Sequence, residues 1–444
     1  MQGLIEKTIV AEAKKRLRRY SQKQYYLHKY RKSFQKRTGV KGKTALHALP
    51  SSWSFHKHFD PRYCINHAKF LAKGVWTSLQ NGTYEPNPAL RVKHAKPTGG
   101  TRSIDVFSVP DAAVAAIFFS NLRKRNAKLF SDSSFAYQEG KTPLDAVIKL
   151  RSLLRREKVF ISQYDFSKFF DSIDHSFIDE ILTIGGPFLT TIMERQVLGS
   201  VVRHQYQENG TLSARNVGTP QGNSVSLFVA NIAAHPLDLE LSSLNGSFAR
   251  FADDCVVVNY SYEDAVRCAE VFFKYSKVSG IQINRAKSSG IRLFSESPSE
   301  MASINHFDFL SYEFTPRGLR ISAKSLRAIK RRCARIIFNH LLLHPRRAKS
   351  IAANRVGRGF YDWDLVTCVN ELRRFIYGGL SQAVIDAYLA GARNVTNFSG
   401  AVSYFCLADQ SDQVRSLDGW LANILHRALR ERRRMERFSK VPTL

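Results

Sequence analysis

The sequence predicts an α/β (α+β) fold, in which an antiparallel sheet is backed by helices and followed by a largely helical region. Residues 159–166 form a mostly apolar run with the length of a buried strand. Residues 248–258 contain two apolar runs that flank Asp253 and Asp254, a pattern typical of a β-hairpin with an acidic tip. Apolar residues over 262–279 recur at helical spacing, which predicts a helix beside these strands.

The length and composition favour several folded subdomains. The chain has 444 residues, and its 44% hydrophobic and 23% charged residues are ordinary for a globular protein rather than a disordered one. The six cysteines are scattered without a CxxC pair, so neither a zinc ribbon nor a disulfide framework is predicted. The start of the chain lacks a secretory signal pattern, and we therefore expect a cytoplasmic protein with reduced thiols.

The charge balance predicts a polyanionic partner. Lys and Arg number 67 against 37 Asp and Glu, which gives a formal net charge of +30. Such a field attracts phosphate backbones, and binding should weaken steeply with salt. A membrane is the weaker alternative, because the longest apolar run, residues 112–119, is far shorter than the ~18 residues of a spanning helix. Composition therefore favours a nucleic acid, and no membrane, as the partner.

Both ends of the chain are strongly basic. Residues 1–45 predict a basic helical extension in which lysines and arginines are followed by tyrosines. Cations that meet phosphates and tyrosines that stack on unpaired bases would make it an RNA-binding arm, and a solvated charged helix is the plainer alternative. The same two interpretations apply to the basic residues over 426–440.

Turn formers and helix formers alternate between these ends. Residues 53–100 are broken by an Asn-Gly pair, a Gly-Gly pair and the prolines at 86, 88 and 97, which favours a strand-rich lobe. Residues 111–125 begin with a helix-start residue followed by strong helix formers, and predict a helix. Residues 322–392 predict a helical lobe, rich in Arg and Lys, that would lie along a duplex.

Three acidic residues stand where strands are predicted to end. Asp165 closes an apolar strand, where helix capping is the ordinary role of such an acid. Asp253 and Asp254 are less ordinary, because adjacent like charges repel and Asp is depleted in strands. Mg²⁺ removes such repulsion by taking carboxylate oxygens, and two ions ~3.5–4 Å apart can clamp both oxygens of an in-line displacement. The pattern therefore predicts metal-dependent nucleotidyl transfer.

Short motifs in a fixed order resemble those of reverse transcriptases. Phe251-Ala252-Asp253-Asp254 resembles their Tyr-x-Asp-Asp box, and residues 165–171 resemble their first catalytic motif. One such match would be weak, whereas an ordered series over about half of the chain is not plausibly accidental. The other members of the series are the fingers motifs at 96–102 with 109–111 and at 134–142, the Pro-Gln-Gly motif at 218–222 with the helix at 230–232, the fourth palm motif at 280–284 with Lys287, and the primer grip at 309–314.

The resemblance implies a right-hand polymerase with fingers, an antiparallel-sheet palm and a helical thumb. The fingers would occupy residues 46–158, the palm 159–315 and the helical thumb 316–400. Basic helical regions, 1–45 and 401–444, would flank these domains.

The resemblance also implies roles for single residues. Asp165, Asp253 and Asp254 would be catalytic and hold two Mg²⁺ ions, with Mn²⁺ as a substitute and the Phe166 backbone carbonyl as a further ligand. Phe170 stands where the family places the steric gate that excludes a ribose 2′-hydroxyl, and a core aromatic is its plainer alternative. The remaining assignments are triphosphate binding by Arg102 and Lys96, a place in the nucleotide pocket for Gln221, protonation of pyrophosphate by Lys287, and a primer grip at Phe309, Leu310, Ser311 and Tyr312.

Two departures from the family pattern bear on the lineage. Phe251 replaces the usual Tyr and keeps its aromatic surface. Residues 223–229, which follow Pro-Gln-Gly, read Asn-Ser-Val-Ser-Leu-Phe-Val, whereas intron enzymes more often carry a Pro after the Ser. No zinc-finger endonuclease tail is recognisable. Within the group II intron and retron lineage, the sequence thus resembles stand-alone bacterial reverse transcriptases, such as those associated with phage defence.

The implied function is cDNA synthesis from dNTPs on a structured noncoding RNA template, with a DNA strand as the product. An RNA-dependent RNA polymerase is a rival, but such enzymes usually carry Gly-Asp-Asp and a small gate residue, unlike Phe251-Ala252 and Phe170. A group II intron-type maturase or RNA-binding scaffold with little polymerase activity is the second alternative. All three acids are present, which gives no sign of an inactivated site.

Overall fold

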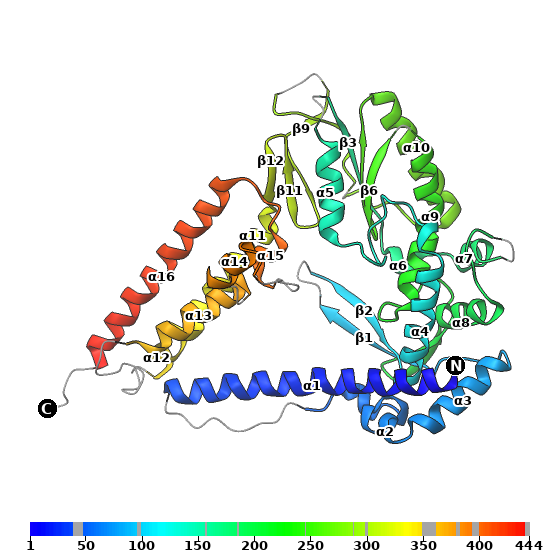
Figure 1. The fold of residues 1–444 in the computed structure, drawn as a ribbon, viewed down its shortest axis with the longest axis horizontal. Coiled ribbons are helices and arrows are strands. Elements are labelled where there is room, and N and C mark those ends of the chain that lie inside the picture. The colour runs from blue at the N-terminus through cyan, green and yellow to red at the C-terminus, as the bar shows by residue number, and fades with distance from the viewer. Residues whose placement is uncertain are drawn as a thin grey trace. The chain divides into compact units, whose positions relative to one another are not determined.

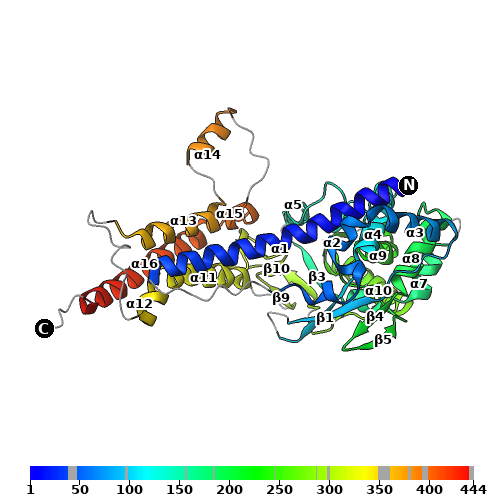
Figure 2. The same ribbon diagram turned by 90° about the horizontal axis from the view of Figure 1, so that it is seen from below.

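The chain folds into two compact units (Figure 1). The first unit comprises residues 1–22 and 48–304, and the second comprises 23–47 and 305–444. Helix α1 (Gln2–Thr38) is unbroken and contributes to both units (Figure 2). The finer division into fingers, palm and thumb stays a prediction. The computed structural model describes residues 1–38, 48–95, 99–155, 158–183, 186–244, 246–286, 288–297, 301–348, 361–378, 382–392 and 399–439.

A five-stranded sheet in the order β6-β7-β3-β8-β9 forms the centre of the first unit. Its strands are β3 (Phe160–Asp165), β6 (Ser247–Phe251), β7 (Asp254–Asn259), β8 (Gly290–Phe294) and β9 (Ser303–Ile304). β3 pairs antiparallel with β7 and β8, and β6 pairs antiparallel with β7. The predicted buried strand and the predicted hairpin with an acidic tip are therefore confirmed.

Helices pack against this sheet and against one another. They are α2 (Pro61–Asn66), α3 (Ala68–Gln80), α4 (Val109–Arg125), α5 (Pro143–Leu153), α6 (Phe169–Ser172), α7 (His175–Ile181), α8 (Ile192–Val202), α9 (Val225–Ser243) and α10 (Tyr262–Ser279). α10 occupies the residues that the apolar periodicity predicts. Its Phe272 ring stacks on Tyr164 of β3 with centroids 3.7 Å apart, and its Tyr275 hydroxyl donates to the Ala233 carbonyl at 2.8 Å. These contacts tie β3, α10 and α9 into one body.

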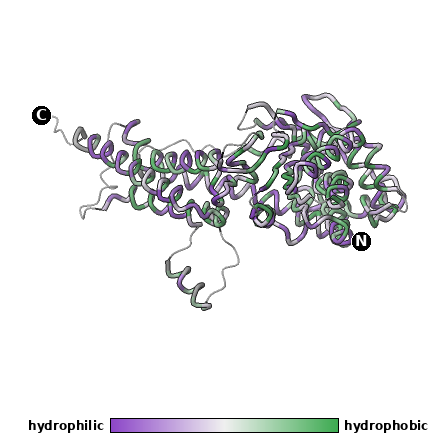
Figure 3. Tube along the Cα trace, turned by 90° about the horizontal axis from the view of Figure 1, so that it is seen from above, coloured by the Kyte–Doolittle hydropathy of each residue, from purple (hydrophilic) through white to green (hydrophobic). Residues whose placement is uncertain are grey.

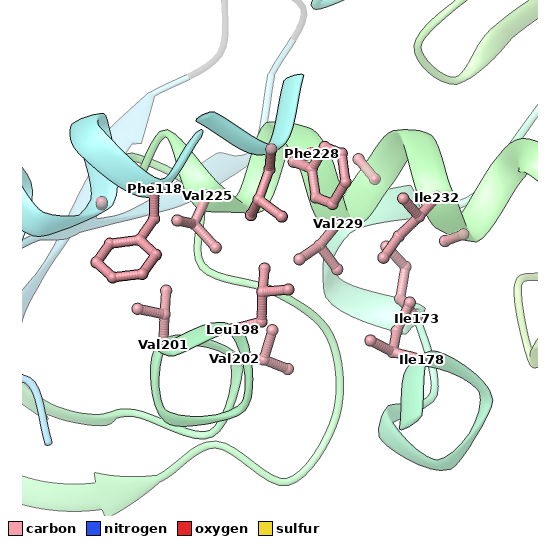
Figure 4. Packing of buried hydrophobic residues seen from close by; sticks show 14 of the residues in the cluster. Phe118, Ile173, Ile178, Leu198, Val201, Val202, Val225, Phe228, Val229 and Ile232 are labelled. Carbon is pink, nitrogen blue, oxygen red and sulfur yellow. The ribbon is translucent and has the colours of Figure 1, made fainter. Parts of the chain in front are cut away.

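Apolar side chains of α4, α8 and α9 meet in the core of the first unit (Figure 4). Phe118, Leu198, Val201, Val225 and Val229 are each at most 4% exposed. Full burial of such a side chain contributes roughly 1.5–3 kcal/mol. This core fixes α9, whose first turn follows the Pro-Gln-Gly motif.

A second sheet of the first unit has the order β2-β1-β4-β5. Its strands are β1 (Ala89–Ala95), β2 (Thr101–Val106), β4 (Gln205–Glu208) and β5 (Thr211–Ala214). The expectation of a strand-rich lobe over 53–100 is wrong, because α2 and α3 occupy most of residues 61–80. The Asp60 side chain caps α2, Pro61 is its first residue, and the turn formers begin only at Asn81, after α3 ends.

The second unit combines a small antiparallel sheet, β10-β11-β12, with amphipathic helices. Its elements are β10 (Phe307–Phe309), β11 (Tyr312–Thr315), β12 (Gly318–Ile321), α11 (Ala323–Ile337), a π-helix (Phe338–Leu342), α12 (Leu343–Ala348), α13 (Trp363–Tyr377), α14 (Gln382–Leu389), α15 (Ala401–Tyr404) and α16 (Ser411–Ser439). Hydrophilic and hydrophobic residues alternate along these helices (Figure 3). Within the described ranges, no helix has the length and apolar composition that a bilayer crossing requires. The predicted helical region is confirmed for its described residues, as is the predicted α/β fold class.

Gly218→Ala is expected to destabilise the first unit. Gly218 has a φ of +76°, and an added Cβ would lie 2.6 Å from the backbone carbonyl of Asp171. A left-handed non-glycine residue costs roughly 1–2 kcal/mol, and overpacking adds roughly 1–3 kcal/mol.

Gly210→Ala is the matched control, because Gly210 has a φ of +89° and an added Cβ would meet no atom within 4 Å. Urea denaturation should give a free energy of unfolding that falls ~1–3 kcal/mol further in Gly218→Ala than in the control. Equal losses would contradict the close contact of this loop with Asp171.

Candidate active site

The three predicted acids lie at one end of the central sheet. Asp165 is the last residue of β3, Asp254 is the first residue of β7, and the two are direct register partners. Directly opposed residues of antiparallel strands have Cα atoms ~4.5–5.5 Å apart. Asp253 lies in the turn between β6 and β7, next to Ala252. The fold therefore brings together carboxylates that are remote in sequence.

The predicted fourth palm motif contacts the end of β3. Asn284 Nδ2 donates to Asp165 Oδ1 at 3.1 Å, and the Asn284 backbone N–H donates to the Asp165 carbonyl at 2.8 Å. Phe166, the residue after β3, forms a bridge with Ile283 and has a side chain only 2% exposed. The sequence motif includes Asn284, but its contact with the Asp165 carboxylate was not predicted.

The donors at this end of the sheet suit a hard divalent cation. The Asp165, Asp253 and Asp254 residues are all partly exposed, so solvent and substrate can reach them. In the described part of the chain, no group of three or more His, Cys, Asp or Glu side chains is positioned to hold a metal ion by itself. Mg²⁺ commonly uses one or two carboxylates and completes its shell with water and substrate phosphates. The carboxylates therefore fit an ion that is shared with a substrate rather than a closed structural site.

The Pro-Gln-Gly loop is hydrogen-bonded to the turn that carries Phe170. The Thr219 N–H donates to the Phe170 carbonyl at 2.6 Å, and Gln221 Nε2 donates to Asp171 Oδ2 at 3.1 Å. The Phe170 ring is partly buried and lies edge-on to the Tyr137 ring, with centroids 6.4 Å apart. Phe170 and Gln221, two predicted nucleotide-binding residues, are thus brought together.

The Tyr137 hydroxyl is influenced by the charge of Arg102 and by that of Asp253 in the turn between β6 and β7, called here the acidic turn. Burial raises the pKa of the Tyr137 hydroxyl, the negative charge of Asp253 raises it further, and the positive charges of Arg102 and Arg250 oppose this. Arg102 is an exposed residue of β2, and its charge acts on the same hydroxyl as that of Asp253. Tyr137 has a φ of 62°, a strained value for a non-glycine residue. It lies in the predicted motif 134–142, yet no role was predicted for it.

A buried carboxylate anchors the second sheet near this pocket. Asp105 accepts from Arg91 Nε at 2.8 Å and from Arg215 Nη2 at 2.8 Å, and it lies 3.4 Å from His204 Nε2. Burial alone would raise the pKa of Asp105, but the close approach of His204, the hydrogen bonds of Arg91 and the charge of Arg215 hold it below the ordinary range. The Asp105 N–H donates to the Gln221 carbonyl at 2.8 Å, which joins this network to the Pro-Gln-Gly loop. Nothing in the sequence indicated this network.

The other predicted site residues are not among the described residues of the first unit. Lys96 and Lys287 fall outside the described residues. The predicted primer grip belongs to the second unit, where Leu310 and Ser311, with φ of 47° and 70°, form the turn between β10 and β11. Phe309 and Tyr312 flank that turn and are at most 1% exposed. The Tyr404 hydroxyl donates to the Leu310 carbonyl at 3.0 Å, so α15 supports the turn.

Comparison with proteins of known sequence finds similarity to proteins whose names place their coding sequences in introns. An uncharacterised 91 kDa protein in the cob intron of Schizosaccharomyces pombe is 27% identical over 173 residues, which are 38% of this chain and 21% of that protein. The group II intron-encoded protein LtrA of Lactococcus lactis is 24% identical over 189 residues, 42% of this chain and 31% of LtrA. The matches thus span about a fifth to a third of the length of these relatives.

Solved structures with a detectable likeness include two telomerases. Apo telomerase of Candida tropicalis gives a TM-score of 0.38 at 14% identity, over 57% of this chain and 59% of that chain. Telomerase of Candida albicans in complex with a fragment of telomeric RNA gives 0.43 at 12% identity, over 80% and 65%. The family model described as reverse transcriptase (RNA-dependent DNA polymerase) matches residues 93–314, half of the chain. This range includes all three acids, and the chain therefore belongs to the reverse transcriptase family.

Proposed function

We propose that the chain is an RNA-directed DNA polymerase that synthesises cDNA by two-metal nucleotidyl transfer. The observation that carries the proposal is the register of β3 against β7, which opposes Asp165 and Asp254 and leaves Asp253 in the adjoining turn. In a member of the reverse transcriptase family, this is the set of oxygen donors that the reaction requires.

The three acids act together at the reacting phosphate. Asp165, Asp253 and Asp254 would hold two Mg²⁺ ions, with the Phe166 backbone carbonyl as a further oxygen ligand. When bound, the ions would lower the pKa of the primer 3′-hydroxyl and neutralise the charge that builds on the leaving pyrophosphate. Asn284 holds the Asp165 carboxylate by its hydrogen bond of 3.1 Å.

The pocket beside these acids selects and orients the nucleotide. Phe170 excludes a ribose 2′-hydroxyl, and the contact of its ring with Tyr137 restricts how far it can turn away. Gln221 lines the pocket, with its side chain fixed by Asp171. The remaining proposed contacts are those of Arg102 and Lys96 with the triphosphate, of Lys287 with the departing pyrophosphate, and of Phe309, Leu310, Ser311 and Tyr312 with the primer.

The template is proposed to be a structured noncoding RNA, and the setting to be phage defence. The net charge of +30 supports a nucleic-acid partner. Tyr25, Tyr26 and Tyr30 of α1 are 60%, 65% and 47% exposed among lysines and arginines, which suits stacking on unpaired bases. Phage defence is supported by the sequence resemblance to stand-alone bacterial reverse transcriptases. Binding of a structured RNA does not require polymerase activity, whereas the formation of a DNA product does.

Replacing both acids of the hairpin tip, Asp253→Ala with Asp254→Ala, should abolish DNA synthesis. Loss of the metal ligands removes several kcal/mol of transition-state stabilisation, or roughly a 10³-fold loss of rate. Primed dNTP incorporation on RNA measures the rate, and sequencing of the nucleic acids that co-purify identifies template and product.

Asp179→Ala is the control, because Asp179 is an exposed acid that pairs with Arg203, the residue that follows α8. We expect a cDNA with wild type and with this control, and none with the double variant. Identical nucleic acid in all three would favour a maturase or RNA-binding scaffold.

Shortening the proposed gate, Phe170→Val, should admit ribonucleotides. The smaller side chain leaves room for a 2′-hydroxyl, and incorporation of rNTP relative to dNTP should rise by roughly 10–100-fold. Phe169→Leu is the matched control, because the Phe169 ring adjoins Phe170 but is only 2% exposed within the core. An rNTP preference unchanged by Phe170→Val would remove the gate assignment.

A further inference from the structure

Arg250 is a charged residue in the interior of the first unit. It lies on β6, two residues before the acidic turn, and is among the largest side chains that are fully buried. An isolated buried charge is strongly unfavourable, so an arginine at such a place must be paired and hydrogen-bonded. Its partners therefore show which parts of the fold the arginine holds.

Asp238 of α9 is the counter-ion. Arg250 Nε donates to Asp238 Oδ1 at 2.7 Å, and Nη2 donates to Oδ2 at 2.5 Å. Both side chains have 0% exposure. Burial would lower the pKa of Arg250, but the Asp238 carboxylate raises it above the ordinary value, so the guanidinium stays charged. This paired geometry fixes the plane of the guanidinium and leaves donors for other groups.

The remaining donors reach two segments of the candidate site. Nη1 donates to the Ala252 carbonyl at 3.0 Å, and Nη2 donates to Ser134 Oγ at 2.7 Å. The Arg250 N–H donates to the Ser133 carbonyl at 2.8 Å, and the Phe135 N–H donates to the Arg250 carbonyl at 2.9 Å. One residue thus connects the acidic turn with the segment that leads into Tyr137.

The contact with Ala252 bears directly on Asp253. Ala252 has a φ of 60°, a left-handed conformation that costs an L-residue roughly 1–2 kcal/mol. The Ala252 carbonyl belongs to the peptide that precedes Asp253, so its direction helps to set where the Asp253 carboxylate points. A lysine could keep the charge opposite Asp238, but its single nitrogen cannot reproduce the planar set of four contacts.

We propose that Arg250 is a positioning residue, which uses Asp238 as its anchor to hold the strained Ala252-Asp253 turn and the Ser134 segment in the geometry that binds the metal ions. The inference rests on the proposed function, since it concerns the same acids. A buried ion pair with a purely structural role would affect stability and nothing else. If Arg250 is a positioning residue, replacing it weakens metal binding in the folded protein. If its role is purely structural, replacing it lowers stability but leaves the metal affinity of the folded protein unchanged.

Arg250→Lys tests the proposal, and Arg432→Lys is the matched control. Arg432 is 2% exposed, donates to Asp362 at 2.7 Å and donates to the Leu341 carbonyl at 3.0 Å, but it lies in the second unit. Mn²⁺ affinity, titrated by electron paramagnetic resonance at a fixed concentration of a non-hydrolysable dNTP, is compared with kcat and KM for dNTP and with the thermal midpoint. Asp253→Asn supplies the baseline for a damaged metal site.

We expect Arg250→Lys to weaken Mn²⁺ binding by ~10-fold and kcat by ~10–100-fold, as for partners that orient metal ligands, with a smaller change in KM. Arg432→Lys should lower the thermal midpoint without weakening Mn²⁺ binding. The proposal is overturned if the two lysine variants lose stability alike and both bind Mn²⁺ like wild type. If Asp253→Asn itself binds Mn²⁺ and polymerises like wild type, the proposed function fails, which is a separate outcome.

A milder pair of variants covers the case in which Arg250→Lys does not fold. Ser134→Ala removes one hydrogen bond to the guanidinium but leaves the ion pair with Asp238 intact. Ser133→Ala is its control, because Ser133 hydrogen-bonds to Arg250 through its backbone carbonyl, which the substitution keeps. Mn²⁺ binding weaker by a factor of ~2–5 in Ser134→Ala alone supports the proposal, on the scale of one lost hydrogen bond of ~0.5–1 kcal/mol. Equal Mn²⁺ affinities in both serine variants contradict it.

Discussion

The pairing register of β3 against β7 is the constraint on which the candidate site depends. Side chains along a strand alternate between the two faces, so a slip of one residue would turn Asp165 to the face opposite Asp254. The stacking of Tyr164 on Phe272 and the hydrogen bond from Asn284 to Asp165 fix the C-terminal end of β3. Local packing around β3 thus decides whether the acids meet.

Bringing these acids together has an electrostatic cost that the rest of the unit must offset. Carboxylates that are brought close together repel one another while both are ionised. Divalent cations relieve this repulsion when they bind, and in their absence the geometry has to come from the surrounding fold. Buried pairs of opposite charge, Arg250 with Asp238 and Arg215 with Asp105, stand next to the acidic turn and the Pro-Gln-Gly loop, respectively. In each pair one residue also hydrogen-bonds to the site: Arg250 donates to the Ala252 carbonyl, and the Asp105 N–H donates to the Gln221 carbonyl.

Apolar patterning predicted β3, β6, β7 and α10, because burial of one face is a local property of the sequence. The helices over 61–80 were missed, since neighbouring turn formers outweighed the capping signal of Asp60 followed by Pro61. Motif order located Asp165, Asp253 and Asp254, but not the partners that hold them. Arg250 meets Asp238 only through the packing of β6 on α9, and Asp105 meets Arg215 from 110 positions away. Such non-local pairs leave no pattern along a single sequence, whereas Tyr137 lies inside a motif, 134–142, that the sequence does reveal.

Anomalous diffraction from crystals soaked with Mn²⁺ and a non-hydrolysable dNTP tests the central claim most directly. The account predicts two Mn²⁺ peaks ~3.5–4 Å apart, both within ligand distance of the carboxylates of Asp165 and Asp253, and with Asp254 beside them. Ions bound elsewhere, or an Asp165 side chain turned away from the hairpin tip, would contradict it.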